Sequence, residues 1–343
     1  MNARLLALVA AMAAAAAFLL TGQTPSPTPA KSPATKKYTP PKTPWGDPDL
    51  QGNWPGNFSI PVERDKGVAG RTTYSAQEFA EREKKQKAGA SGRNFGIEYM
   101  YPVNQTSLVV DPPDGRLPAM TPPAQKRMKE MRDGLGPPTL FTPEGRAEWT
   151  YDFDLWGRCI TKGLIGSMLP GNLYNKGNQI VQAPGYFIMR NEMVHESRVV
   201  PLDGRPHVSQ TIRTYMGDGR GHWEGNVLMI ETTNFKDNIG HNGFNQSHTT
   251  DQLKIVERLE RMAPDALSYD ITVTDPGTWT RPWTMHMPFK QDNEYTVYEY
   301  ACHEGNYDVL NILRGAREDD AKGLKRAEPG GSGGRGGRGG TEQ

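Results

Sequence analysis

The fold is decided between residues 253 and 289, which read LKIVERLERMAPDALSYDITVTDPGTWTRPWTMHMPF. Hydrophobic and polar residues alternate in segments 253–262, 267–275 and 283–289, and this period of two is typical of half-buried β-strands. The turn sequences Ala-Pro-Asp at 263–265 and Asp-Pro-Gly at 275–277 separate the segments. The stretch therefore predicts antiparallel neighbours in one sheet.

The same alternation extends along much of the chain. Pro184-Gly185 and Asp203-Gly204 are the turn residues between further segments. The predicted additional strands are 50–54, 107–111, 179–182, 186–192, 197–202, 226–235 and 295–302. A meander of this size usually closes or folds over, because an unpaired strand edge exposes its backbone groups. We therefore expect a mainly β fold, an antiparallel meander closing into a barrel.

Two helices are predicted outside the sheet. Ser75-Ala76-Gln77-Glu78 is a capping box that begins a charged segment at 76–87. Thr121-Pro122 begins a second segment at 122–132. Both segments have thin apolar faces, so we expect peripheral helices rather than core elements.

The N-terminus has the layout of a secretory signal peptide. Arg4 precedes an apolar run at 5–20, and small polar residues follow. This run is short for a membrane span, although a retained anchor is the alternative interpretation. We predict a signal peptide at 1–23 and a periplasmic or secreted protein with no stable membrane span after cleavage.

Composition divides the rest of the chain. A Pro-rich linker is predicted at 24–45, a single β-rich domain with helical insertions at 46–315, and a disordered Gly/Arg tail at 316–343. The formal net charge is only +1, so no overall basic field attracts nucleic acid. Arg335 and Arg338 form a short RGG pair, for which a solvated tail is the simpler explanation. We expect no nucleic-acid partner.

The chain has two cysteines, Cys159 and Cys302. Both would meet an oxidising compartment if the protein is exported, so the sequence predicts a disulfide between them. The alternative is a nucleophilic Cys302 beside His303. Adjacent side chains on a strand point to opposite faces, which places that pair poorly for catalysis.

Two resemblances can be named from these motifs. Gly52-Asn53-Trp54 resembles the Gly-x-Trp signature that opens lipocalin-like barrels, in which the Trp plugs the closed end. From residue 44 to about 317, the chain is similar to a family of uncharacterised exported proteins of environmental bacteria. The motifs that carry this similarity include PWGDPDLQGNW, GRCITKGLIGSMLP and YEYACHEGNY. The second resemblance implies export and a single unit but no activity, and the first implies a lipocalin-like barrel.

Three acids share the register of apolar residues on predicted strands. Glu257 falls in the same register as Ile255 and Leu259, and the same parity rule also points Glu231 and Glu299 inward. A buried carboxylate requires partners, and the available cationic residues include Arg198, Arg258, Arg281, His195 and His303. The alternatives are a structural Glu–Arg network or acids on a solvated outer face.

These residues give the candidate site. We predict His195, Glu257 and Glu299 as catalytic groups if the protein is an enzyme. The predicted ligand-binding residues are Arg198, Glu231, Trp223, Trp283, Tyr298 and Tyr300, because aromatic rings with a few inward polar groups are typical of small-molecule sites.

Motifs for cofactors and metals are missing from the sequence. There is no P-loop, dinucleotide-binding motif or nucleophile elbow. His222, His241 and His248 have no metal-ligand spacing, so they could bind a metal only if folding brought them together. We expect no cofactor and no metal.

Three functions stay open at this point. The first is a β-barrel that binds a small, partly apolar or aromatic molecule in its lumen or mouth. The second is a cofactor-independent lyase, isomerase or hydrolase that uses carboxylate and histidine acid–base catalysis in the same pocket. The third is a structural envelope protein.

Overall fold

The computed structural model describes residues 38–90, 100–132, 149–150, 153, 155–164, 166–167, 175–236 and 249–323. The predicted signal peptide, most of the linker, and the tail beyond residue 323 lie outside these residues, as do His241 and His248. Within the described ranges, no helix is long and apolar enough to cross a membrane.

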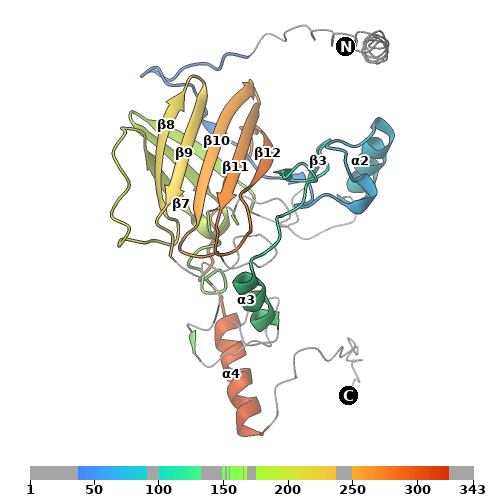
Figure 1. Ribbon diagram of the computed structural model, residues 1–343, viewed down its shortest axis with the longest axis vertical. Helices are drawn as coiled ribbons and strands as arrows, with labels where there is room; N and C mark the ends of the chain where they lie inside the picture. The colour runs from blue at the N-terminus through green and yellow to red at the C-terminus, as the bar shows by residue number, and fades with distance from the viewer. Residues whose placement is uncertain are drawn as a thin grey trace, which may run out of the picture. The chain divides into compact units, whose positions relative to one another are not determined.

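The larger sheet has six strands in the order β4-β12-β11-β10-β9-β8. Its strands are β4 (Val109–Asp111), β8 (Asp218–Glu224), β9 (Val227–Thr233), β10 (Lys254–Ala263), β11 (Ala266–Thr274) and β12 (Trp283–Lys290). All neighbouring strands in it are antiparallel, and Figure 1 shows β8 to β12 side by side. The alternating pattern at 253–289 thus predicted β10, β11 and β12 correctly.

The smaller sheet has the order β1-β5-β6-β7 and is also antiparallel. Its strands are β1 (Gly52–Asn53), β5 (Asn178–Ala183), β6 (Tyr186–Asn191) and β7 (Ser197–Pro201). Although β7 and β8 are consecutive, they belong to separate sheets. The fold is mainly β and antiparallel as predicted, but closure into a barrel is not confirmed.

The hydrophobic core contains inward side chains from both sheets. On β10, Ile255 and Leu259 are buried, whereas the residues between them are mostly half-buried. The smaller sheet contributes residues such as Phe187 and Val200 to the same apolar cluster. Trp54 is also buried there, and its indole N–H donates to the carbonyl of Leu50 at 2.9 Å. Burial of both inner faces is what holds the two sheets together.

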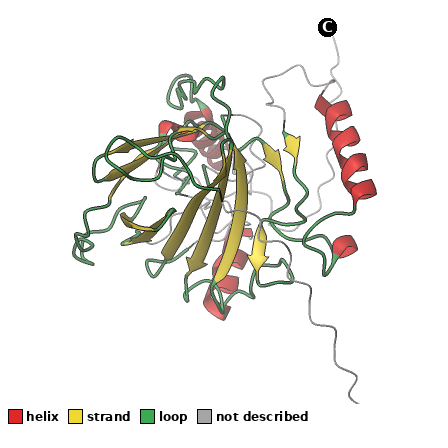
Figure 2. Cartoon of the chain, turned by 90° about the horizontal axis from the view of Figure 1, so that it is seen from above, coloured by secondary structure: helices red, strands yellow, loops and turns green. Residues whose placement is uncertain are grey.

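Both predicted helices exist. They are α2 (Ala76–Ala90) and α3 (Pro122–Arg132). Figure 1 shows α2 beside β3 and apart from the larger sheet, and Figure 2 shows the same region from above. The capping box is formed, because the Glu78 carboxylate accepts from the Ser75 amide at 2.8 Å and the Ser75 hydroxyl accepts from the Glu78 amide at 3.3 Å. A two-stranded parallel sheet joins β2 (Phe58–Ser59) and β3 (Tyr101–Pro102).

Three sequence predictions were wrong or incomplete. Segment 295–302 is not a strand, because polar contacts described below hold it as a loop. Strand β8 was missed because its sequence, DGRGHWE, lacks an alternating apolar pattern. Helix α4 (Asp308–Ala321) was also missed and overlaps the predicted disordered tail. Its buried Leu313 packs near Phe153 in a second apolar cluster.

Candidate functional site

Arg198 and Glu257 form a buried ion pair between the two sheets. Arg198 lies on β7 and Glu257 on β10, and the guanidinium donates two hydrogen bonds to the carboxylate, one of them at 2.6 Å. The Tyr269 hydroxyl on β11 donates to the same carboxylate. Glu257 is 0% exposed. It faces the interior, as its register predicts, and its charge is fully paired.

The electrostatics of this network follow from its burial. Desolvation alone would lower the pKa of Arg198, but the adjacent Glu257 carboxylate raises it above the ordinary value. Burial and the same carboxylate raise the pKa of Tyr269 well above its usual range. The guanidinium therefore stays charged and the phenol stays protonated. Such a network links the sheets and leaves no free acid for catalysis.

The other two predicted inward acids are elsewhere. Glu231 lies on the outer face of the larger sheet, because the inward residues of β9 are Leu228, Ile230 and Thr232. Its carboxylate pairs with the Lys254 ammonium at 2.5 Å. Glu299 is exposed, because segment 295–302 is a loop and its alternation does not define a face. The prediction that these acids share an interior with Glu257 was therefore wrong.

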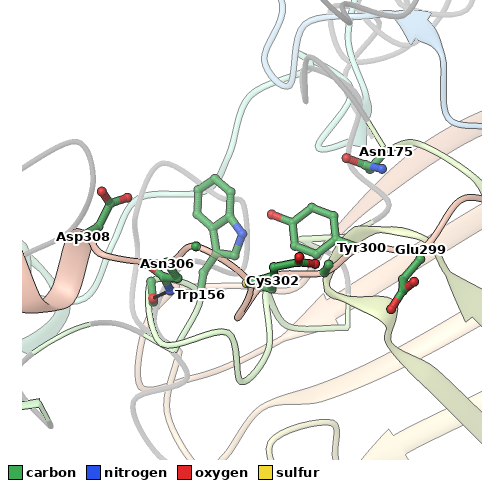
Figure 3. Close-up of a pocket in the computed structure, with 11 residues that line it drawn as sticks. Trp156, Asn175, Glu299, Tyr300, Cys302, Asn306 and Asp308 are labelled. Carbon is green, nitrogen blue, oxygen red and sulfur yellow. Dashed lines mark hydrogen bonds between the residues drawn. The ribbon is translucent and has the colours of Figure 1, made fainter.

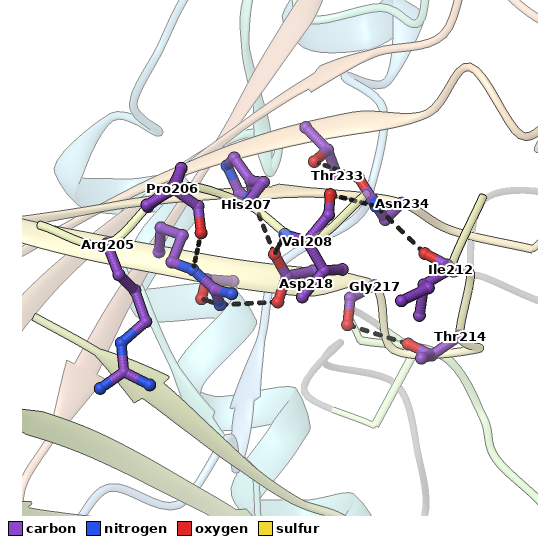
Figure 4. A network of polar contacts seen from close by, with 12 residues as sticks. Arg205, Pro206, His207, Val208, Ile212, Thr214, Gly217, Asp218, Thr233 and Asn234 are labelled. Atoms are coloured by element: carbon purple, nitrogen blue, oxygen red, sulfur yellow. Dashed lines mark hydrogen bonds and ion pairs between the residues drawn. The ribbon is translucent and has the colours of Figure 1, made fainter. Parts of the chain in front are cut away.

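Glu231 belongs to a polar network on that outer face. His207 Nδ1 lies 2.9 Å from Asp218 Oδ2, and its Nε2 lies 3.5 Å from Glu231 Oε1. Arg220 pairs with the other oxygen of Asp218 at 2.6 Å. Figure 4 shows His207 reaching down to Asp218, with the Asn234 amide contacting the neighbouring loop. The network fastens the loop after β7 to the sheet.

The predicted aromatic residues divide between core and surface. Trp283 is fully buried against Trp279, with ring centroids 5.4 Å apart. Trp223 is half-buried against the core, and Tyr298 is 66% exposed. Of the predicted aromatic ligand-binding residues, Tyr300 is the one that lines the pocket described below.

A buried glutamate holds the segment that contains Tyr300. Glu192 is 1% exposed and accepts hydrogen bonds from the Asn175 amide at 2.8 Å and the Tyr295 hydroxyl at 2.7 Å. The Gly177 amide also donates to it, and a Cβ at Gly177 would lie 2.5 Å from its carboxylate oxygen. His195, predicted as catalytic, is exposed, and its Nδ1 lies 3.0 Å from the Tyr300 carbonyl oxygen. These contacts replace the predicted strand pairing.

A second buried glutamate holds three of the described residues in the GRCITKGLIGSMLP motif. Glu196 accepts from the Thr161 hydroxyl, the Lys162 amide at 2.9 Å and the Ser167 hydroxyl at 2.7 Å. Burial raises the pKa of Glu196, although the three hydrogen bonds oppose that shift. The Lys162 ammonium lies 4.3 Å from the centre of the Trp156 ring, and burial lowers its pKa to about 8.

The depressed pKa of Lys162 gives a pH-dependent stability that can be measured. Below pH 8, Lys162 is charged in the folded and unfolded chains, so the folded state bears the full burial penalty. Between about pH 8 and 10.5, the unfolded chain binds the extra proton, so this residue's contribution to stability rises with pH. We expect Lys162→Met to increase the free energy of unfolding most at pH 7. The advantage over the wild type should shrink by about 1–3 kcal/mol by pH 10.

Urea unfolding of both proteins across this pH range checks the prediction. Lys254→Met, which changes a half-buried lysine on the outer face of the larger sheet, is the control variant. A constant difference between Lys162→Met and the wild type would show that the amine is not desolvated in the folded protein.

The predicted disulfide between Cys159 and Cys302 is confirmed, and it links residues 143 positions apart in the sequence. It joins loop 155–161 to the segment that precedes α4. The Asn306 amide strengthens this junction by donating to the Gly157 carbonyl at 3.1 Å and to Cys159 Sγ at 3.2 Å. Two parts of the chain that are distant in sequence thus meet at one place.

A pocket of about 380 Å³ lies at this junction. Its walls carry two aromatic rings, three carboxylates and two amide side chains, from Trp156, Tyr300, Glu299, Glu304, Asp308, Asn175 and Asn306. In Figure 3 the rings of Trp156 and Tyr300 lie between Asp308 on one side and Glu299 on the other. Glu299 and Tyr300 were predicted from the sequence, and the others were missed. The predicted disulfide could have indicated the site, because the missed Trp156, Glu304 and Asn306 each lie within four residues of one of its cysteines.

The structure brings together Arg198 with Glu257, and His195 with Tyr300, but as two separate sets of contacts. Among the described residues, no group of three or more histidine, cysteine, aspartate or glutamate side chains could hold a metal ion. Comparisons of the chain with protein-family models, curated proteins and solved structures found no match.

Proposed function

We propose that this protein binds a small, partly aromatic molecule in the pocket beside the Cys159–Cys302 disulfide. The observation that carries the proposal is the pocket itself, whose volume of about 380 Å³ falls within the range typical of small-molecule sites. Trp156 and Tyr300 supply flat apolar surfaces for the ligand, and the surrounding amides and carboxylates supply orientation.

The contacts around the pocket support a preformed site. Glu192 accepts hydrogen bonds from the Asn175 side chain and from segment 295–298, which fixes one part of the pocket lining. The disulfide and the Asn306 contact with Gly157 fix another part. A site held in place before binding loses less conformational entropy when its ligand arrives. These ties are the physical reason to place the ligand here.

The proposal extends to the surrounding fold and location. The chain passes through β5 to β12 in sequence order across both sheets, so joining β7 to β8 would produce a lipocalin-like meander. In that arrangement the pocket would serve as the mouth. The signal-peptide pattern at 1–23 supports action in the periplasm or outside the cell.

Binding is better supported than acid–base catalysis. The predicted acid Glu257 is enclosed by Arg198 and Tyr269, so it offers no proton-transfer group to a ligand. The remaining predicted pair, His195 and Glu299, is exposed, and the histidine Nδ1 contacts the backbone carbonyl of Tyr300.

The test uses two tyrosines that are two residues apart. Tyr300 lines the pocket, whereas Tyr298 is 66% exposed and does not line it. Neutral and charged aromatic fragments are screened by ligand-observed NMR against the wild type, Tyr300→Ala and Tyr298→Ala. We expect hits to bind the wild type and Tyr298→Ala with equal affinity and to bind Tyr300→Ala at least ten-fold more weakly. An absence of hits, or hits that bind Tyr300→Ala as tightly as the wild type, would overturn the proposal.

A further inference from the structure

The charges that line the pocket indicate which chemical class of ligand it binds. The acidic residues Glu299, Glu304 and Asp308 line it, and no lysine or arginine is among its lining residues. We propose that the ligand is an organic cation, an ammonium or amidinium group attached to an apolar or aromatic body. This inference rests on the pocket being the ligand site.

The three carboxylates lack the counterions that acids elsewhere in the protein have. Within the described part of the chain, no lysine or arginine forms an ion pair with Glu299, Glu304 or Asp308. By contrast, Glu231 pairs with Lys254 and Asp218 pairs with Arg220 on the sheet face. A cation in the pocket would be attracted by all three carboxylates, an attraction that salt screens because these residues are exposed.

Asp308 has an additional structural role that the other two acids lack. It is the first residue of α4, where the helix dipole stabilises a negative charge. Glu299 and Glu304 are exposed and lie in loops, so solvent rather than a helix terminus stabilises their charges. Both charges are therefore accessible to a ligand in the pocket.

The aromatic walls are suited to the same ligand. An organic cation is attracted to the electron-rich faces of Trp and Tyr rings. The Lys162 ammonium lies 4.3 Å from the centre of the Trp156 ring, so this ring already contacts one cation. Lys162 itself does not line the pocket. Glu196 lies near Lys162 and offsets its charge. The indole thus contacts an internal cation and also lines a pocket that has three acidic residues.

The cavity is too large for a bare ion. A water molecule occupies roughly 30 Å³ of liquid volume, about a twelfth of the pocket's 380 Å³. The apolar ring surfaces would also remain exposed around a small hydrated ion. An extended organic cation fills the space and contacts both the rings and the carboxylates.

The test compares ligands that share a shape and differ in charge. Benzyltrimethylammonium is the cationic probe, neopentylbenzene is its neutral carbon isostere, and phenylmethanesulfonate is the anion. Affinities are measured by ligand-observed NMR at low and at physiological salt. We expect the cation to bind at least ten-fold more tightly than the neutral probe and the anion not to bind, with the cation's advantage shrinking as salt increases.

Two double variants separate local from general charge effects. Glu299→Gln/Glu304→Gln removes two of the three pocket charges and should remove most of the cation's advantage. Glu294→Gln/Asp319→Asn removes the same charge from exposed residues outside the pocket and should retain it. Tyr300→Ala should weaken the cationic and neutral probes alike.

The outcomes distinguish this inference from the proposed function. Equal binding of the cation and the neutral probe, both dependent on Tyr300, would overturn the cationic ligand and leave the small-molecule site intact. Failure of all three probes on the wild type would overturn the cationic ligand. The proposed function would then fall if the wider fragment screen also found no ligand. Micromolar Ca²⁺ that displaces benzyltrimethylammonium would identify a metal site instead, and would also overturn the inference.

Discussion

Replacing Glu257 with leucine should lower the free energy of unfolding by about 3–5 kcal/mol, because the substitution leaves the Arg198 guanidinium charged and buried without its partner. The Tyr269 hydroxyl would lose its acceptor in the same interior. Urea unfolding followed by tryptophan fluorescence measures the loss.

A double variant tests whether the uncompensated charge causes this effect. Arg198→Met/Glu257→Leu removes both charges and replaces them with apolar side chains, so it should recover most of the stability. Glu231→Leu is the matched control, because its partly exposed ion pair with Lys254 should be worth less than about 1 kcal/mol. A double variant no more stable than Glu257→Leu would show that the loss of stability comes from losing the ion pair, and not from the unpaired charge of Arg198.

Removing the disulfide should have the second large effect. Cys159→Ser/Cys302→Ser frees a loop spanning 143 positions. For such a loop the chain-entropy model assigns about 4–5 kcal/mol, and the measured loss should be about 2–4 kcal/mol because unfolded chains retain some structure. Thermal or urea unfolding of the variant under non-reducing conditions measures the change.

The disulfide variant should also lose ligand binding before it loses its sheets. Trp156 and Gly157 lie on one side of the bridge, and Glu299 to Asp308 lie on the other. Without the bridge, the Asn306 contacts with Gly157 and residue 159 would still join these walls. We expect the variant to keep wild-type far-ultraviolet circular dichroism at 25 °C while fragment binding falls at least ten-fold. Dithiothreitol should reproduce this loss in the wild type and leave the variant unaffected, whereas a variant with wild-type affinity would contradict the expectation.

Local patterns predicted most of the regular elements. Alternation at 253–289 gave β10, β11 and β12, and the capping box at Ser75 gave α2. The signals for β8 and α4 were too weak, because Gly219 and Gly221 interrupt the β8 pattern and the α4 sequence continues into a Gly-rich tail. Segment 295–302 had the alternation of a strand without a neighbouring strand to pair with, so Glu192 and Cys159 determine its course instead.

The sequence by itself determined the mainly antiparallel β fold, the inward register of Glu257 and the pairing of Cys159 with Cys302. These properties follow from period-two patterning and from the presence of only two cysteines, and both features can be read from the sequence. Only the tertiary structure decided that Glu257 is enclosed by Arg198 and that Glu231 and Glu299 face outward. It also decided that the candidate site lies at Trp156, Tyr300 and their acidic neighbours. The physical reason is that the pocket and the charges around each residue depend on which distant segments the fold brings into contact. Local patterning determines only which face of a strand each side chain occupies.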